Sequence, residues 1–64
     1  MTTFGEKVKT RREELQIGQE QLANLIGVSR RTIVSYETGT ARPREAKLRK
    51  LAEALGVTQS NNLP

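Results

Sequence analysis

Apolar residues recur along this chain at intervals of three and four residues, a spacing typical of amphipathic helices. The clearest pattern, at i, i+3, i+4 and i+7, consists of Leu48, Leu51, Ala52 and Leu55. It predicts a helix that starts near Pro43 and ends before Gly56. Shorter patterns predict three further helices, at about 4–15, 19–26 and 30–37. Because the chain has 64 residues and few strand-forming ones, we expect an all-α fold, a compact four- to five-helix bundle forming one domain over residues 1–64.

Residues that favour helix ends stand at the boundaries of these segments. Thr3 and Glu6 have the spacing of a capping box, in which each side chain accepts a hydrogen bond from the other residue's amide. Gly39 can end the third helix in the left-handed conformation. Pro43 suits the first turn of the fourth helix, because its missing amide hydrogen would be unpaired there in any case.

The second and third predicted helices are joined by a very short turn. Gly27 stands where the chain must stop and reverse, and only glycine enters the left-handed region without steric cost. Ser29 follows as an N-cap whose hydroxyl can accept a hydrogen bond from an amide of the next helix. This arrangement, over about residues 19–38, is a helix-turn-helix, in which the second helix lies in the major groove of DNA.

The positive charge of the chain is concentrated around and after the third helix. The formal net charge is +4, from 11 Lys and Arg residues and 7 acidic ones. Residues 30–50 hold seven of these basic residues and two acidic ones, a net +5, so the remainder carries −1. This distribution indicates a polyanionic partner, and a basic surface that only keeps the protein soluble is the less specific alternative.

Arg12 interrupts the apolar stripe of the first helix, for which Phe4, Val8 and Leu15 are expected to face the core. Its spacing places it on the same side, where a guanidinium without a partner would be strongly destabilising. Glu37, at the end of the third helix, is the expected partner. We therefore predict an Arg12–Glu37 ion pair that joins these two helices, with two unrelated surface charges as the alternative.

A set of residues spread over the chain is typical of one family: Gln19, Leu22, Ala23, Gly27, Val28, Ser29, Ile33, Tyr36, Glu37, Gly39, Pro43 and the segment from Leu48 to Val57. In these residues, and over about 4–57, the chain resembles the Cro/repressor (Xre) family of helix-turn-helix proteins. The resemblance implies a lambda-repressor-like DNA-binding domain with the helix-turn-helix at helices 2 and 3. It also implies that an arginine at the position of Arg12 pairs with Glu37.

The chain departs from the family pattern in three places. Gly18 stands where Ser, Thr or Asn usually caps the second helix, so we expect a weaker cap. Arg11 stands where Leu is common, which implies either a thinner contact of the first helix or an additional phosphate contact. The family's fifth helix, often part of its dimer contact, is only faintly represented in residues 58–63. The segment 58–64 lacks an apolar face, and we expect it to be weakly structured.

The first residues of a recognition helix face the edges of the bases, and Arg30 and Arg31 occupy that place. The planar fork of an arginine matches the O6 and N7 acceptors of guanine. Ser35 lies one turn after Arg31 and can bond a base or a bridging water. Val34 flanks this face, where it either contacts a thymine methyl group or is incidentally exposed. The sequence leaves open which arginine reads a base and which reaches a phosphate.

Other polar residues are expected to contact the DNA backbone: Gln19, Ser29, Thr32, Thr38, Arg42 and Arg44. Gln19 begins the second helix, whose amides and dipole favour a phosphate, and the resemblance implies the same role for it. Thr38, Arg42 and Arg44 resemble the family's backbone-clamping residues. The remaining basic residues of the fourth helix better fit ordinary surface pairs, such as Glu45 with Arg49.

Other classes of function find little support. His, Cys and Asp are absent, which removes the commonest catalytic bases, the thiol nucleophiles and the usual metal clusters. The five glycines are scattered, so the chain contains no glycine-rich phosphate loop. We expect no enzyme activity, cofactor, metal or small-molecule ligand. Because the chain contains neither a membrane-spanning run nor a signal-peptide pattern, we expect a cytoplasmic, nucleoid-associated protein.

These features together predict a sequence-specific regulator of transcription that binds double-stranded DNA. One recognition helix reads few base pairs, so we expect a homodimer, acting as a repressor on a near-palindromic operator with half-sites about one helical turn apart. The short C-terminal segment leaves open whether the dimer also forms without DNA. The alternative is a protein- or RNA-interaction module, antitoxin-like or coactivator-like, built on the same fold.

Overall fold

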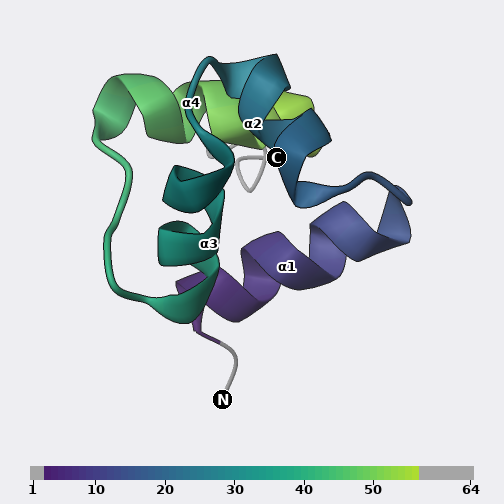
Figure 1. Ribbon diagram of the computed structural model, residues 1–64, viewed down its shortest axis with the longest axis horizontal. Helices are drawn as coiled ribbons and strands as arrows, with labels where there is room; N and C mark the ends of the chain where they lie inside the picture. The colour runs from purple at the N-terminus through teal and green to yellow at the C-terminus, as the bar shows by residue number, and fades with distance from the viewer. Residues whose placement is uncertain (1–2, 57–64) are drawn as a thin grey trace, which may run out of the picture.

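The computed structural model describes residues 3–56, and over this range it contains four helices and no strand. Figure 1 shows them as α1, Phe4–Glu14; α2, Gln19–Ile26; α3, Arg30–Thr38; and α4, Glu45–Ala54. The four predicted helices are therefore confirmed, three of them to within one residue at each end. The segment 58–64, which we expected to be weakly structured, and the faint fifth helix lie outside the described residues.

The predicted signals at the helix ends act as expected. The Thr3 hydroxyl accepts a hydrogen bond from the Glu6 amide (3.2 Å), and a carboxylate oxygen of Glu6 accepts one from the Thr3 amide (3.0 Å). Gly27 ends α2 with a φ of 77°, a conformation that a residue with a Cβ atom adopts only under strain. Gly18 provides no side-chain cap for α2, as its departure from the family pattern implied.

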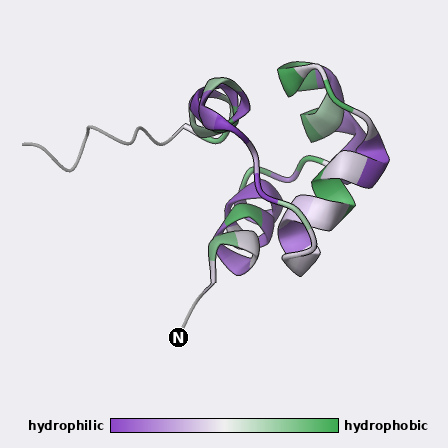
Figure 2. Ribbon diagram, turned by 90° about the vertical axis from the view of Figure 1, so that its left-hand side faces the viewer, coloured by the Kyte–Doolittle hydropathy of each residue, from purple (hydrophilic) through white to green (hydrophobic). Residues whose placement is uncertain are grey.

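The core consists of apolar side chains from all four helices: Val8, Leu22, Ala23, Ile26, Ile33, Tyr36, Leu51 and Leu55. Figure 2 shows hydrophobic and hydrophilic residues interspersed along the helices, as is typical of helices that bury one side. α2 packs against both α3 and α4, and α1 packs against α3. This packing holds one side of α3 and leaves its other side to solvent.

A glycine allows α1 to approach α3 closely. Gly5 is buried, and a Cβ atom at this position would overlap the backbone carbonyl oxygen of Glu37 and lie 2.6 Å from that of Tyr36. Because both obstacles are backbone atoms, they cannot move away as the end of a flexible side chain can. The first turn of α1 therefore fits against the last turn of α3 only with glycine at this position.

Two expectations from the sequence were wrong. Pro43 does not lie in the first turn of α4, because Arg44 is extended (φ −76°, ψ 172°) and α4 begins at Glu45. The segment 39–44 spans the distance from one end of α3 to the start of α4 (Figure 1), and extended residues cover about twice the length of helical ones. Leu15 is 38% exposed, because α1 ends before it and the chain turns at Gln16 (φ 61°). Ile17 packs against the core instead.

Candidate nucleic-acid interface

The start of α3 is fixed by its N-cap. The hydroxyl oxygen of Ser29 accepts a hydrogen bond from the Thr32 amide at 3.2 Å, as its position predicted. The same oxygen lies 3.0 Å from the hydroxyl oxygen of Thr32. Ser29 and Thr32, both expected to contact the DNA backbone, therefore form one hydroxyl pair at the N-terminus of α3. Amides at a helix N-terminus favour an anion there.

Of the predicted base-reading residues, Arg31 lies on the outer side of α3 and Arg30 is exposed at its first position. Ile33 and Tyr36 are buried, with exposures of 0% and 6%. Successive helical residues are rotated by about 100°, so Arg31 lies on roughly the opposite side of the helix from this pair. Arg30 and Arg31 are both exposed, and within residues 3–56 neither forms an ion pair. No acidic residue among residues 3–56 therefore occupies their guanidinium groups, which can bind a ligand.

The remaining two base-reading candidates, Val34 and Ser35, are half-buried. Ser35 follows Arg31 by four residues and shares its side of the helix. Val34 lies to one side of this line, which leaves its methyl groups partly accessible. α3 therefore presents two long basic side chains at its start and two short side chains one turn later.

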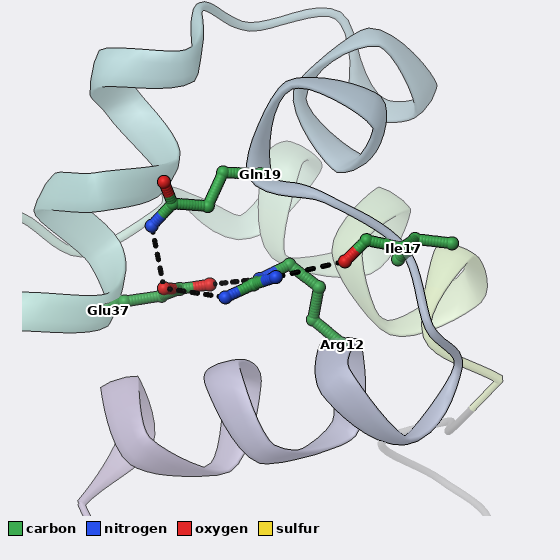
Figure 3. Close-up of polar contacts among 4 residues, drawn as sticks. All are labelled: Arg12, Ile17, Gln19 and Glu37. Atoms are coloured by element: carbon green, nitrogen blue, oxygen red, sulfur yellow. Dashed lines mark hydrogen bonds and ion pairs between the residues drawn. The ribbon is translucent and has the colours of Figure 1, made fainter.

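The predicted contact between Arg12 and Glu37 is present in the structure (Figure 3). Arg12 Nε donates to Glu37 Oε2 at 2.6 Å, and Arg12 Nη2 lies 3.4 Å from Oε1. The side chains are 10% and 5% exposed, so solvent screens the pair weakly. Arg12 Nη1 also donates to the carbonyl oxygen of Ile17 at 2.9 Å. The one guanidinium thus joins α1, the segment before α2 and the last turn of α3.

Gln19 takes part in the same network, which the sequence did not predict. Its Nε2 donates to Glu37 Oε1 at 3.1 Å, and Figure 3 shows its carbonyl oxygen directed away from the carboxylate. Because the amide has two hydrogens, one remains for the phosphate that we expected it to contact. Glu37 therefore holds the start of α2 as well as α1, and both ends of the helix-turn-helix are connected through a single carboxylate.

Three residues that we expected to contact the DNA backbone, Thr38, Arg42 and Arg44, lie from the last residue of α3 to the N-cap of α4. Thr38 Oγ1 donates to the Ser35 carbonyl oxygen at 3.3 Å and lies 3.0 Å from Thr40 Oγ1. The Arg42 guanidinium lies over the Phe4 ring, 5.1 Å from its centroid, which holds this part of the loop near the start of α1. Arg44 is exposed and forms the N-cap of α4.

Two basic residues bind backbone carbonyls at helix ends, and the sequence reasoning missed both. Arg11 Nε donates to the Leu55 carbonyl oxygen at the end of α4 (2.7 Å), a contact that was not among the two alternatives considered for this residue. Lys47 Nζ donates to the Ile26 carbonyl oxygen at the end of α2 (3.1 Å). One signal was available for Lys47, since α2 has no basic residue in its own last turn. The predicted surface pair of Glu45 and Arg49 is present at 3.5 Å.

None of the four helices within residues 3–56 is long and apolar enough to cross a membrane.

Comparison with known proteins places this geometry in a family. A model of the helix-turn-helix family HTH_3 matches residues 8–58. The cryptic phage CTXphi transcriptional repressor RstR of Vibrio cholerae is 41% identical over 54 residues, which cover 84% of this chain and 49% of that protein. The HTH-type transcriptional repressor RghR of Bacillus subtilis is 41% identical over 58 residues, 89% of this chain and 43% of that protein. The chain spans about half the length of these curated relatives.

The fold is shared with a repressor of known structure. In the crystal structure of the P22 c2 repressor with synthetic operator 9T, the matching chain is 30% identical, with a TM-score of 0.90 over 94% of this chain and 91% of that one. The four helices therefore form a lambda- and P22-repressor-like helix-turn-helix DNA-binding domain, as the resemblance implied. Because the family model matches most of the length of this chain, the chain belongs to the Xre-type helix-turn-helix family.

Proposed function

We propose that this chain binds double-stranded DNA in a sequence-specific manner and regulates transcription by occupying an operator. The observation that carries the proposal is the start of α3, where Arg30 and Arg31 are exposed and without ion pairs among residues 3–56. The fold is shared with a repressor that was crystallised on its operator, which supports DNA as the partner. The names of the curated relatives favour repression as the mode of regulation.

The proposed contacts assign a role to each of the predicted site residues. α3 enters the major groove, where the edges of the bases are read by Arg30, Arg31, Val34 and Ser35. Phosphates are contacted by a set of residues around the ends of α2, α3 and α4: Gln19, Ser29, Thr32, Thr38, Arg42 and Arg44. The buried pair of Arg12 and Glu37 holds the helices in register and contacts no DNA.

We further propose that two copies bind together. α3 has nine residues, and one such helix covers only a few base pairs. Useful specificity therefore requires two half-sites about one helical turn apart, read by a homodimer on a near-palindromic operator. A protein with this function works on the nucleoid in the cytoplasm.

Selection of bound duplexes from a random pool at near-physiological salt tests the proposal. We expect enrichment of an inverted repeat by the unaltered chain. The double variant Arg30→Ala, Arg31→Ala is the matched control, because both positions are exposed and the fold is expected to persist. Its circular dichroism should be unchanged while the enrichment is lost.

Three outcomes would count against parts of the proposal. Binding without enrichment would reduce the basic face to a non-specific electrostatic clamp. Enrichment of a single half-site, together with light scattering that shows a monomer on DNA, would contradict the proposed homodimer. Failure to bind DNA would favour a protein or RNA partner.

A further inference from the structure

α4 contacts the turn of the helix-turn-helix through one positive charge. Lys47 lies in the first turn of α4, and its Nζ donates to the carbonyl oxygen of Ile26 at 3.1 Å. The carbonyl oxygen of Gly27 lies 3.5 Å from the same ammonium. Ile26 is the last residue of α2, and Gly27 is the left-handed residue at which the chain reverses towards α3. The ammonium therefore binds both sides of the point where α2 ends.

The end of α2 is a place where such a cation is stabilising. The last carbonyl groups of a helix have no partner within it, and together they carry a partial negative charge. The last turn of α2 contains no basic residue of its own. Lys47 supplies from another helix both the hydrogen-bond donor and the charge that this helix end lacks. The contact is partly shielded, because Ile26 is only 1% exposed and Lys47 is half-buried.

The orientation of α3 depends on this turn. Between Gly27 and Ser29 the chain changes direction, and Arg30 and Arg31 follow at once. α4 packs against α2 (Figure 1), so α4 influences α3 by way of α2 and this turn. A small rotation at the turn would move the tips of long arginine side chains, and groove recognition tolerates little displacement.

We propose that Lys47 is a positioning residue for DNA recognition. Its ammonium holds the turn between α2 and α3, and with it the direction of Arg30 and Arg31, while itself contacting no DNA. This inference rests on the proposed function. The competing role is that of a phosphate contact, which the positive charge around Lys47 would also suit.

The two roles predict different binding behaviour. A lysine that contacts a phosphate contributes equally to all duplexes, and its loss lowers the dependence of log K on log salt by about one. A lysine that positions α3 contributes only where base edges are read. Its loss weakens binding to the preferred duplex and leaves binding to unrelated duplexes and the salt dependence unchanged.

The experiment compares Lys47→Met with Lys50→Met, an exposed lysine of the same helix, so that each variant loses one charge and keeps an unbranched stem. Affinities are measured for the duplex enriched from the random pool and for a shuffled duplex, at several salt concentrations, where circular dichroism shows both variants folded. We expect Lys47→Met to lose about threefold to tenfold more affinity for the enriched duplex than Lys50→Met does. The two variants should bind the shuffled duplex with equal affinity. Lys47→Arg should recover most of the affinity for the enriched duplex that Lys47→Met loses.

Equal losses of Lys47→Met on both duplexes, with a reduced salt dependence, would overturn the proposal in favour of a phosphate contact. The proposal would also be overturned if Lys47→Met and Lys50→Met bound the enriched duplex with equal affinity. Amide hydrogen exchange gives a reading without DNA, because the Val28 amide donates across the turn to the Ala23 carbonyl oxygen (3.0 Å). It should exchange faster in Lys47→Met than in Lys50→Met, and an equal rate would show that Lys47 does not hold the turn. If the unaltered chain does not distinguish the duplexes, the proposed function fails, and the exchange rates still decide this point.

Discussion

Arg12 and Glu37 form a buried ion pair in which one carboxylate joins α1 to the last turn of α3. The two residues are 25 positions apart, and their closest nitrogen and oxygen atoms lie 2.6 Å from each other. Each residue also has a further partner: Arg12 Nη1 donates to the Ile17 carbonyl oxygen, and Glu37 Oε1 accepts from Gln19 Nε2. A buried pair with this degree of satisfaction is costly to break, because the partner left behind stays charged and desolvated.

Glu37→Ala should therefore lower the free energy of unfolding by about 3–5 kcal/mol. For a domain of this size such a loss lowers the melting temperature by well over 10 °C, by the scale of about 4–8 °C per kcal/mol. Thermal and urea unfolding followed by circular dichroism measure the effect. Glu45→Ala is the matched control, because its pair with Arg49 is 85% and 70% exposed and should contribute less than about 1 kcal/mol. Equal melting temperatures for the two variants would show that the pair adds nothing.

Gly5→Ala should destabilise the fold in a different way. The added Cβ atom would overlap the backbone of Glu37, so α1 and α3 would have to separate. Overpacking of this kind costs about 1–3 kcal/mol. Chemical denaturation measures the loss, and chemical shifts of the Tyr36 and Glu37 amides should report the displacement. If Gly5→Ala had the same free energy of unfolding as the unaltered chain, α1 could move away from α3 without loss of stability.

A substitution at Gly18 should stabilise the fold. It caps α2 without a side chain, its φ of −82° suits any residue, and a Cβ atom added there would meet no other atom within 4 Å. Gly18→Ser should raise the free energy of unfolding by about 0.5–1 kcal/mol, from the added cap and the smaller entropy of the unfolded chain. Gly18→Ala separates these causes, since it restricts the unfolded chain but adds no cap. A serine variant no more stable than the alanine variant would show that the cap is not formed.

Local signals carried most of the prediction of the fold. The capping box at Thr3, the reversal at Gly27 and the N-cap at Ser29 each depend on backbone conformation within a few residues, and all three are present in the structure. The pairing of Arg12 with Glu37 was also within reach, because a charge on an apolar stripe requires a partner and few acids lay on a matching face. The predicted start of α4 was wrong, because the true start depends on the distance that the preceding loop must span.

The missed contacts share a physical cause. Lys47 and Arg11 bind carbonyl oxygens at the ends of other helices, and every helix end offers such acceptors regardless of its sequence. No side chain marks the acceptor, and the lack of a basic residue in the last turn of α2 does not say which residue supplies the charge, so Lys47 and Arg11 are interpreted as surface charges from the sequence alone. Gln19 was assigned a phosphate from its place at the start of the second helix and from the resemblance, and its bond to Glu37 became visible only once α2 and α3 were placed together.

The last prediction separates residues that read sequence from residues that bind charge. If about six phosphates are neutralised per bound unit, log K should fall against log salt with a slope near −5. Arg44→Ala removes an exposed arginine at the start of α4. It should weaken binding to every duplex and make the slope less steep by about one, near −4. Arg31→Ala should cost about 1–3 kcal/mol on the enriched duplex alone and relax the preference at one base pair, because Arg31 lies on the outermost side of α3. Titrations of both variants on enriched and shuffled duplexes measure these effects. If Arg44→Ala changed the preferred sequence, or Arg31→Ala changed only the slope, the division between base-reading and phosphate-binding residues would be reversed.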